Sequence, residues 1–507
     1  MSLRSRRPSP DPDRRAAAAL PLPRRRTPSR AGRAAVLSLA AVALIGAAPP
    51  PDAPGVRGLG DRLFPSLGNP GYDVTSYDVD LDYSGHNDRP LKAVTEINAH
   101  VTGALEHLNL DFARGKVSSV EVNGLPARHQ QYGEDLVITP SAVPVPGQQL
   151  RIVVRHTSDP RGKSDGGWIR TGDGLVMANQ ADAAHRVFPC NDHPSDKAFF
   201  TFHISAPRGV TAVANGELQN RSDRGPRRTW LYRTVHPMAT ELAQVSLGRS
   251  SVIRALGPHG LPVRSVVPVA DRKTLAPWVA RTPAQLDWME RKVGPFPFEN
   301  YGVLIADATT GFELETQTLS LFEKGLFAGR LPQWYVESIM VHELSHQWFG
   351  DSVSPRLWSD VWLNEAHASW YEALYAQEKG GPPASMDARM QRAYQLSDRW
   401  RAEGGPPAAP KAARAGQKIS IFRPVIYDGG ALVLYALRHR IGPAAFDRLE
   451  RTWVTRHRDG VAGTGDFVAL AAEISGQDLT GFFQSWLYGA KTPPMPGHPE
   501  WRAVRKH

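Results

Sequence analysis

Polar and apolar residues alternate along much of the chain between about residues 70 and 255. The clearest example is YDVTSYDVDLDY at 72–83, and alternation over such a length is typical of a strand with one buried face. Two of the apolar segments run into Asn123-Gly124 and Asn215-Gly216, a dipeptide that favours tight β-hairpins. We therefore predict an antiparallel β domain, a sandwich or a curved saddle, with further strands at 116–122, 150–156 and 210–214.

Beyond about residue 256 the apolar residues mostly recur every three to four positions, as they do in helices. TLAPWVARTPAQLDWMERKVG (274–294) predicts a helix that ends at a glycine, whereas YGVLIAD (301–307) and TQTLSLF (316–322) predict strands. The rest is expected to be mostly helical, at 334–349, 362–379, 385–402, 428–441, 444–456 and 465–475. The chain is therefore expected to have a multi-domain α+β fold.

The net charge of +10 is concentrated at the N-terminus. Residues 1–33 carry ten arginines against two aspartates, which leaves +2 for residues 34–507. Because the body of the chain has no long basic stripe, binding to nucleic acid is not expected.

An apolar run, Ala34–Ala48, follows the arginine-rich start. A basic segment, a run of about 15 apolar residues and small residues before a break are typical of a secretory signal. A membrane span needs roughly 20 apolar residues. We expect export to the medium or the cell envelope, with an uncleaved N-terminal membrane anchor as the alternative. Cys190 is the only cysteine, which excludes an intrachain disulfide and a cysteine-based zinc site.

The candidate chemistry lies in VHELSHQWFG (341–350). His342 and His346 are four residues apart, so on a helix they lie one turn apart on the same face. Zinc favours such nitrogen ligands, and a hydrolytic zinc site keeps a position open for water. Glu343 is rotated by about 100° from His342. It is therefore placed to act as a general base toward that water rather than as a ligand.

A third metal ligand is expected from LNEAHASWYEALYAQEK, a second segment with helical spacing. Gly350 and Pro355 lie in the link between the two helices, so the chain can reverse there and bring Glu365 beside the histidine pair. His367 is rotated by about 200° from Glu365, so we interpret it as a supporting or structural residue. Partners that orient the histidines are also expected, and three nearby acids are candidates: Asp351, Asp360 and Glu372.

With His342, Glu343, His346 and Glu365 in this spacing, the sequence resembles the M1 family of zinc aminopeptidases, the gluzincin group that includes aminopeptidase N. Family-like segments also occur at 187–200, 295–301, 348–353, 358–365 and 482–496. Composition and pattern indicate a targeting segment with a disordered linker (1–55), an N-terminal β domain (56–255) and a polar, proline-rich tail (496–507). The resemblance implies that the part between them is a thermolysin-like zinc catalytic domain (256–495). It implies a short, secreted bacterial form without the family's C-terminal helical domain.

The resemblance also implies two residues that bind the α-amine of the substrate. Glu315, in GFELETQTLS (311–320), stands where the family's G-A-M-E-N motif has its glutamate, although the surrounding residues differ. Glu313 is the competing carboxylate, because a strand places residues two apart on the same face. Gln180, nine residues before Pro189, stands where the family has a glutamine that contacts the amine.

The last implied residue is Tyr427 in VIYDGGALVLYALR, where the family reads Y-x-K-G. Its hydroxyl would donate a hydrogen bond to the oxyanion of the tetrahedral intermediate. Gly429 replaces the usual lysine. Tyr435 is the alternative tyrosine, but it falls within an apolar helical segment and is better interpreted as core.

We therefore expect an aminopeptidase with one Zn²⁺ per chain and peptides with a free N-terminus as substrates. Glu343 would act as the base, Tyr427 would stabilise the oxyanion, and Glu315 with Gln180 would hold the amine. The alternatives are an endopeptidase of the thermolysin type and a non-catalytic binding protein on an M1 fold. The sequence specifies neither the preferred first residue nor the oligomeric state.

Overall fold

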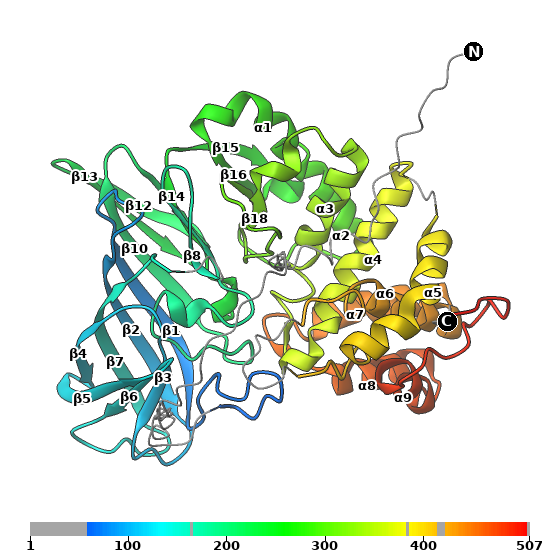
Figure 1. Ribbon diagram of the computed structural model, residues 1–507, viewed down its shortest axis with the longest axis horizontal. Helices are drawn as coiled ribbons and strands as arrows, with labels where there is room; N and C mark the ends of the chain where they lie inside the picture. Colours follow the sequence, from blue (N-terminus) through cyan, green and yellow to red (C-terminus); the bar gives the residue numbers. More distant parts are fainter. Residues whose placement is uncertain (1–57, 163–165, 382–384, 413–420, 504–507) are drawn as a thin grey trace, which may run out of the picture.

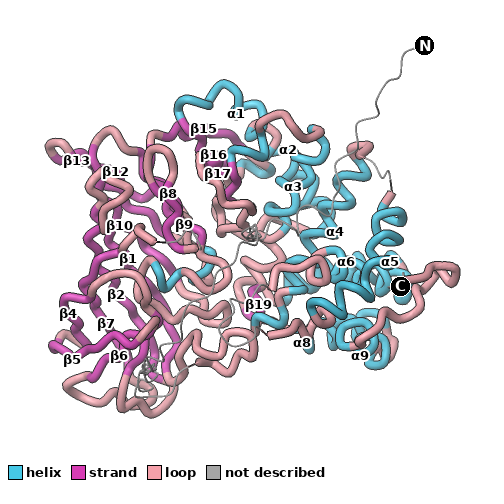
Figure 2. The backbone as a smooth tube through the Cα atoms, viewed as in Figure 1, coloured by secondary structure: helices cyan, strands magenta, loops and turns pink. Residues whose placement is uncertain are grey.

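A computed structural model describes residues 58–162, 166–381, 385–412 and 421–503. The predicted targeting segment and linker at 1–55 lie outside the described residues. Strands are gathered in one half of the molecule and most helices in the other (Figures 1 and 2). The predicted class, a β domain followed by a mainly helical domain, is confirmed.

The N-terminal half is built on a ten-stranded sheet in the order β12-β13-β10-β1-β2-β7-β4-β5-β6-β3. Its pairings are antiparallel except that of β1 with β10. The strands are β1 (Tyr72–Asp82), β2 (Leu91–Val101), β3 (Leu108–Asp111), β4 (Val117–Val122), β5 (Leu125–Tyr132), β6 (Asp135–Thr139), β7 (Gln149–Ser158), β10 (Phe199–Pro207), β12 (Glu217–Arg224) and β13 (Arg227–Arg233).

A second sheet, in the order β11-β14-β9-β8, shares a hydrophobic core with the first. Phe200 and Phe202 of β10 and Val213 of β11 all lie in this core. Alternate side chains are buried along β1 and β2, as the alternating pattern predicts. The strands of the second sheet are β8 (Gly167–Arg170), β9 (Leu175–Ala178), β11 (Thr211–Ala214) and β14 (Val245–Gly248).

One of the two predicted hairpins is confirmed. Asn123 and Gly124 both have positive φ, 49° and 81°, and connect the paired residues Val122 and Leu125. The hairpin prediction at Asn215-Gly216 is wrong, because β11 pairs with β14 whereas β12 pairs with β13. The Asn215 side chain instead joins separate segments, donating from Nδ2 to the carbonyl oxygens of Leu242 and Gln317.

A third sheet opens the C-terminal half, in the order β15-β16-β17-β18. Its strands are β15 (Ser250–Leu256), β16 (Pro262–Pro268), β17 (Val303–Ala306) and β18 (Ser320–Glu323). The predicted domain boundary at 255/256 falls within β15. A short parallel pair, β19 (Ser354–Pro355) and β20 (Val461–Ala462), follows farther along the chain.

The helices form the larger part of this half. They are α1 (Arg272–Val279), α2 (Thr282–Val293), α3 (Gln333–Ser345), α4 (Trp362–Glu378), α5 (Met386–Gly404), α6 (Asp428–Ile441), α7 (Pro443–Arg456), α8 (Thr464–Ser475) and α9 (Thr480–Tyr488). Most residues of α3, α4 and α6 are buried, and apolar side chains from all three helices lie in one hydrophobic core. α9 was not among the predicted helices.

Three predicted elements differ from the structure. The helix expected over 274–294 is broken between α1 and α2, because Pro283 cannot donate a helical hydrogen bond and instead stands at the start of α2. The helix expected over 334–349 ends at Ser345. The strand expected over 316–322 begins only at Ser320, because Thr318 adopts a positive φ of 65° within a turn.

The segment expected as a polar tail packs against the protein as far as it is described. Trp501 is buried, and its ring stacks on Tyr435 of α6. Among the described residues, no helix combines the length and the apolar character that crossing a membrane requires.

Candidate active site

The end of α3 presents the two histidines together. His346 follows the last helical residue, Ser345, and keeps helical backbone angles (φ −58°, ψ −26°), so the spacing of one turn is preserved. The ring centroids of His342 and His346 are 5.0 Å apart. Both rings are buried, because α3 is covered on every side from Val336 onward.

Glu365 of α4 completes a three-ligand cluster. Its Oε2 lies 3.4 Å from Nε2 of His342 and 3.5 Å from Nε2 of His346. Tetrahedral zinc with bonds of 2.0–2.1 Å separates its ligand atoms by about 3.3 Å. Oε2 is also buried without a hydrogen-bond partner among the described residues. The three atoms therefore fit one zinc ion.

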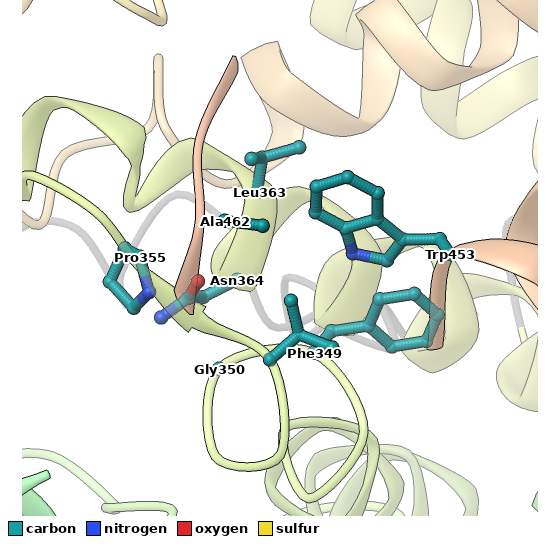
Figure 3. Close-up of a pocket in the computed structure, with 8 residues that line it drawn as sticks. Phe349, Gly350, Pro355, Leu363, Asn364, Trp453 and Ala462 are labelled. Carbon is teal, nitrogen blue, oxygen red and sulfur yellow. The ribbon is translucent and has the colours of Figure 1, made fainter. Parts of the chain in front are cut away.

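The loop after α3 packs closely against the start of α4, where Gly350 lies near Asn364 (Figure 3). Gly350 has a φ of 132°, and a Cβ there would lie 3.0 Å from Nδ2 of Asn364. Asn364 directly precedes Glu365, so this contact brings the start of α4 close to the histidines. A glycine is favoured at position 350 for both its backbone angle and its lack of a side chain.

The other nitrogen of each imidazole faces an acceptor. Nδ1 of His342 lies 2.9 Å from Oε2 of Glu372, and Nδ1 of His346 lies 3.2 Å from the carbonyl oxygen of Phe349. An acceptor at Nδ1 favours the tautomer that keeps the Nε2 lone pair for a metal. Glu372 lies seven residues after Glu365, two turns along the same face of α4.

The other two candidate acids make no contact of this kind. Asp360 accepts hydrogen bonds from the backbone and hydroxyl of Thr464, and the Asp351 carboxylate is buried without a hydrogen-bond partner in the described structure. His367 lies beside Glu450 and stacks on Phe349, in agreement with a structural role.

The electrostatics of the cluster are dominated by opposing charges. Burial lowers the pKa of His342 and His346, but the surrounding carboxylates outweigh it and the net pKa of both imidazoles is raised. Burial raises the pKa of Glu365, but the two histidines overcome it and bring this pKa down to about 2. The carboxylate of Glu365 is thus favoured in its charged form, the form that binds a metal.

Gln180 and Glu315 meet although they are 135 residues apart. Gln180 follows β9, and its Nε2 donates to Oε1 of Glu315 at 2.6 Å. The same Oε1 lies 3.9 Å from Nδ1 of His346, so the pair borders the metal cluster. Glu315 is buried, whereas its competitor Glu313 is only half-buried.

Gln347 holds the backbone of Glu315 in place, a role that no sequence motif indicated. Its Nε2 donates to the carbonyl oxygen of Glu315 at 3.0 Å, and its Oε1 accepts from the backbone N–H of Thr318 at 2.8 Å. The residue after the second histidine thereby fixes the position of Glu315 relative to α3.

Tyr427 precedes α6 and lies half-buried against the cluster. Its ring centroid is 5.9 Å from that of His342, with 25° between the ring planes. Tyr435 is part of the core of α6, and its hydroxyl donates to Oδ1 of Asp387 at 2.9 Å. The structure therefore brings Tyr427, and not Tyr435, to the histidines.

Two family models match the chain in succession. The model of the peptidase M1 N-terminal domain matches residues 74–242, and that of the peptidase family M1 domain matches residues 281–486. The chain belongs to peptidase family M1. In this M1 chain the second match contains both histidines, Glu315, Glu365 and Tyr427, and the first contains Gln180.

Characterised M1 relatives are longer than this chain. Aminopeptidase N of Streptomyces lividans is 24% identical over 445 residues, which cover 82% of this chain and 50% of that protein. Aminopeptidase M1-D of rice (Oryza sativa subsp. japonica) is 28% identical over 316 residues, or 60% of this chain and 36% of that one. The chain thus spans about half or less of the length of these relatives.

Solved M1 structures match over nearly their whole length. The M1 zinc metallopeptidase from Deinococcus radiodurans superposes with a TM-score of 0.73 at 26% identity, over 89% of this chain and 100% of that one. A variant of the Deinococcus enzyme bound to a Tyr-Ser-Ala substrate gives a TM-score of 0.73 at 25% identity, over 87% and 100% of the two chains. The M1 homologues imply zinc as the cofactor, and the His-His-Glu geometry fits it.

Proposed function

We propose that this M1 chain is a zinc aminopeptidase that hydrolyses the first peptide bond of peptides with a free N-terminus. The observation that carries the proposal is the Gln180–Glu315 pair at the edge of the His-His-Glu cluster. A buried carboxylate beside a metal site needs a compensating cation, and the α-ammonium of a peptide can supply it. An endopeptidase would have no cation to place there.

Two residues would bind the substrate amine, and the zinc would act on the scissile bond. Glu315 accepts hydrogen bonds from the α-ammonium and fixes which bond is cut. With Nε2 of Gln180 donating to Glu315, Oε1 of Gln180 is the atom that can accept from the same ammonium. The zinc held by the cluster would polarise the scissile carbonyl and lower the pKa of water at the site.

Proton transfer and charge stabilisation come from two further side chains. Glu343, buried within the same group of ionisable residues as Glu315 and His346, takes the proton of the attacking water and delivers it to the leaving amine. The Tyr427 hydroxyl donates to the oxyanion that develops on the scissile carbonyl. Its contact with the His342 ring supports this role.

The Glu315→Gln variant tests the amine-binding role. We expect kcat/KM on alanyl, leucyl and arginyl amides to fall roughly a hundredfold, because the variant removes one partner of a buried charged pair. Glu313→Gln is the matched control, and its kcat/KM should stay within about twofold of the wild type. Both variants should bind zinc as the wild type does.

Two outcomes would contradict the proposal. If the wild type cleaves internal bonds of N-acetylated peptides and Glu315→Gln does so equally well, the chain is an endopeptidase. If the zinc-loaded wild type hydrolyses neither substrate class, the chain is a binding protein on an M1 fold. Glu343→Gln, which should keep zinc but lose activity about 10²–10⁴-fold, excludes a contaminating peptidase.

We also propose that the protein is exported. The proposal rests on the arginine-rich start and the apolar run Ala34–Ala48, which have the order of a secretory signal. Residues 1–55 fused to a reporter enzyme should direct that reporter out of a bacterial cell. Retention of the reporter in the cytoplasm would contradict export, and recovery in the membrane fraction would indicate an anchor.

A further inference from the structure

Arg389 of α5 contacts the carboxylate that orients a metal-binding histidine. Its Nη1 donates to Oε1 of Glu372 at 3.2 Å, while Oε2 of the same carboxylate lies 2.9 Å from Nδ1 of His342. The Glu372 side chain is 8% exposed and that of Arg389 25% exposed. Glu372 thus stands between the imidazole and the guanidinium.

The same guanidinium also binds the start of α6. Nε and Nη2 of Arg389 both lie 2.9 Å from Oδ1 of Asp428. Asp428 is the first residue of α6 and directly follows Tyr427. Because the Tyr427 ring packs on the His342 ring, the contacts form a closed circuit through α3, α4, α5 and α6.

We propose that Arg389 is a positioning residue that holds His342 and Tyr427 in the relative geometry that catalysis requires. The inference rests on the proposed aminopeptidase function and adds a residue that does not itself touch the substrate. Two carboxylates, Glu372 and Asp428, bind the same guanidinium. Without a cation between them, their repulsion would separate α4 from the start of α6.

An arginine suits this position better than a lysine. The planar guanidinium presents several N–H donors in a fixed fork, so it can bind Glu372 and Asp428 at the same time. A lysine ammonium has the charge, but it is a compact group that cannot span both carboxylates in the same way. We therefore expect the kcat of Arg389→Lys to lie between that of Arg389→Met and that of the wild type.

The test compares Arg389→Met with Arg399→Met, a change on the same helix that removes an exposed ion pair to Glu403. On a leucyl amide, kcat of Arg389→Met should fall about 10- to 100-fold, the usual effect of losing an outer partner of a metal ligand. KM should change less than twofold, because Glu315 and Gln180 are untouched. Arg399→Met should match the wild type in both constants.

Asp428→Asn tests the same inference from the other partner of Arg389. It remains informative if Arg389→Met fails to fold. Its kcat should fall in the same way, and the double variant should be no slower than the slower single variant, because both changes break one circuit. Unchanged kcat in the single variants, or losses that multiply in the double variant, would overturn the inference.

Zinc affinity separates this inference from the proposed function. In competition with a chelator, Arg389→Met should bind zinc about 10- to 100-fold more weakly than the wild type, because Glu372 loses the partner that orients it toward His342. An inactive wild type would refute the aminopeptidase proposal and leave this measurement intact. Equal zinc affinity in wild type and variant would refute the role of Arg389.

Discussion

Burial shifts the pKa of several ionisable residues in the described part of the chain, and neighbouring charged groups oppose or reinforce that shift. Glu365, between two histidines, has a pKa lowered to about 2. Asp111 and His156 are buried with less compensation: burial raises the pKa of Asp111 to about 7 and lowers that of His156 to about 4. The compensated group belongs to the candidate metal cluster, whereas His156 is buried in the β domain.

The neutral His156 should make stability depend on pH. The pKa of His156 in the folded state, about 4, lies below the ordinary value of 6.5. Its contribution to the free energy of unfolding is therefore complete above pH 6.5 and is lost as the pH falls toward 4. Between pH 7 and 5, the free energy of unfolding should fall by about 2 kcal/mol more in the wild type than in His156→Gln.

Denaturant unfolding at the two pH values measures this difference. His100→Gln, at an exposed position on the neighbouring strand β2, should show the same pH dependence as the wild type. Equal pH dependence in the wild type and His156→Gln would show that His156 does not carry the effect.

At the scale of elements, the approach of α6 to α4 decides where Tyr427 lies. A Cβ on Gly430 would lie 2.8 Å from the Cβ of Ala366, which directly follows Glu365. The two helices therefore touch where α4 carries Glu365 and α6 begins beside Tyr427. A Cβ on Gly429 would meet nothing closer than 3.4 Å.

Gly430→Ala should separate these helices. We expect a loss of about 1–3 kcal/mol in the free energy of unfolding, because the added methyl group overfills a packed contact. The value of kcat should fall as Tyr427 moves, while zinc content stays at one per chain. Thermal unfolding and steady-state kinetics measure the two effects.

Gly429→Ala is the control on the adjacent position. It should be neutral or stabilising by up to about 1 kcal/mol, because alanine has a higher helix propensity than glycine and its Cβ would make only ordinary van der Waals contacts. If both variants behave alike, close packing at Gly430 does not position Tyr427.

At the scale of the molecule, the N-terminal half takes part in building the site. Its Gln180 donates to Glu315, and its Lys197 donates from Nζ to the carbonyl oxygens of Asp351 and Ser352 at 2.8 and 2.9 Å. The Asp351 N–H in turn donates to the carbonyl oxygen of His346. The loop that follows α3 is therefore held in place by the N-terminal half of the molecule.

Lys197→Met should loosen this connection. Two buried carbonyl groups would lose a charged donor, which should lower the free energy of unfolding by about 1–3 kcal/mol. Zinc should also dissociate faster, as measured by its transfer to a coloured chelator. The control is Lys292→Met, which removes a more exposed ion pair with Glu378 and should leave the rate of zinc dissociation unchanged. An unchanged rate in Lys197→Met would show that Lys197 does not hold this loop in place.

Some features were predictable because they depend on residues close together in the chain. The spacing of His342 and His346 fixes their common face through the helical repeat, and Asn123-Gly124 specifies its hairpin through backbone angles alone. The alternating pattern likewise determined which side chains of β1 and β2 are buried. The family resemblance then indicated Glu315, Gln180 and Tyr427.

Other features depend on which surfaces pack together, and local patterns do not specify this. Asn215-Gly216 has the same sequence as the true hairpin, yet its side chain binds two distant carbonyl groups and its flanking strands enter different sheets. The sequence did not distinguish Glu372 from two other nearby acids as the residue that orients a histidine. Only the packing of α3 against α4 identifies it. The contacts of Gln180 with Glu315, and of Arg389 with Glu372 and Asp428, exist only because separate helices and loops converge. The sequence by itself determined the metal-binding chemistry, and tertiary packing decided which side chains orient it.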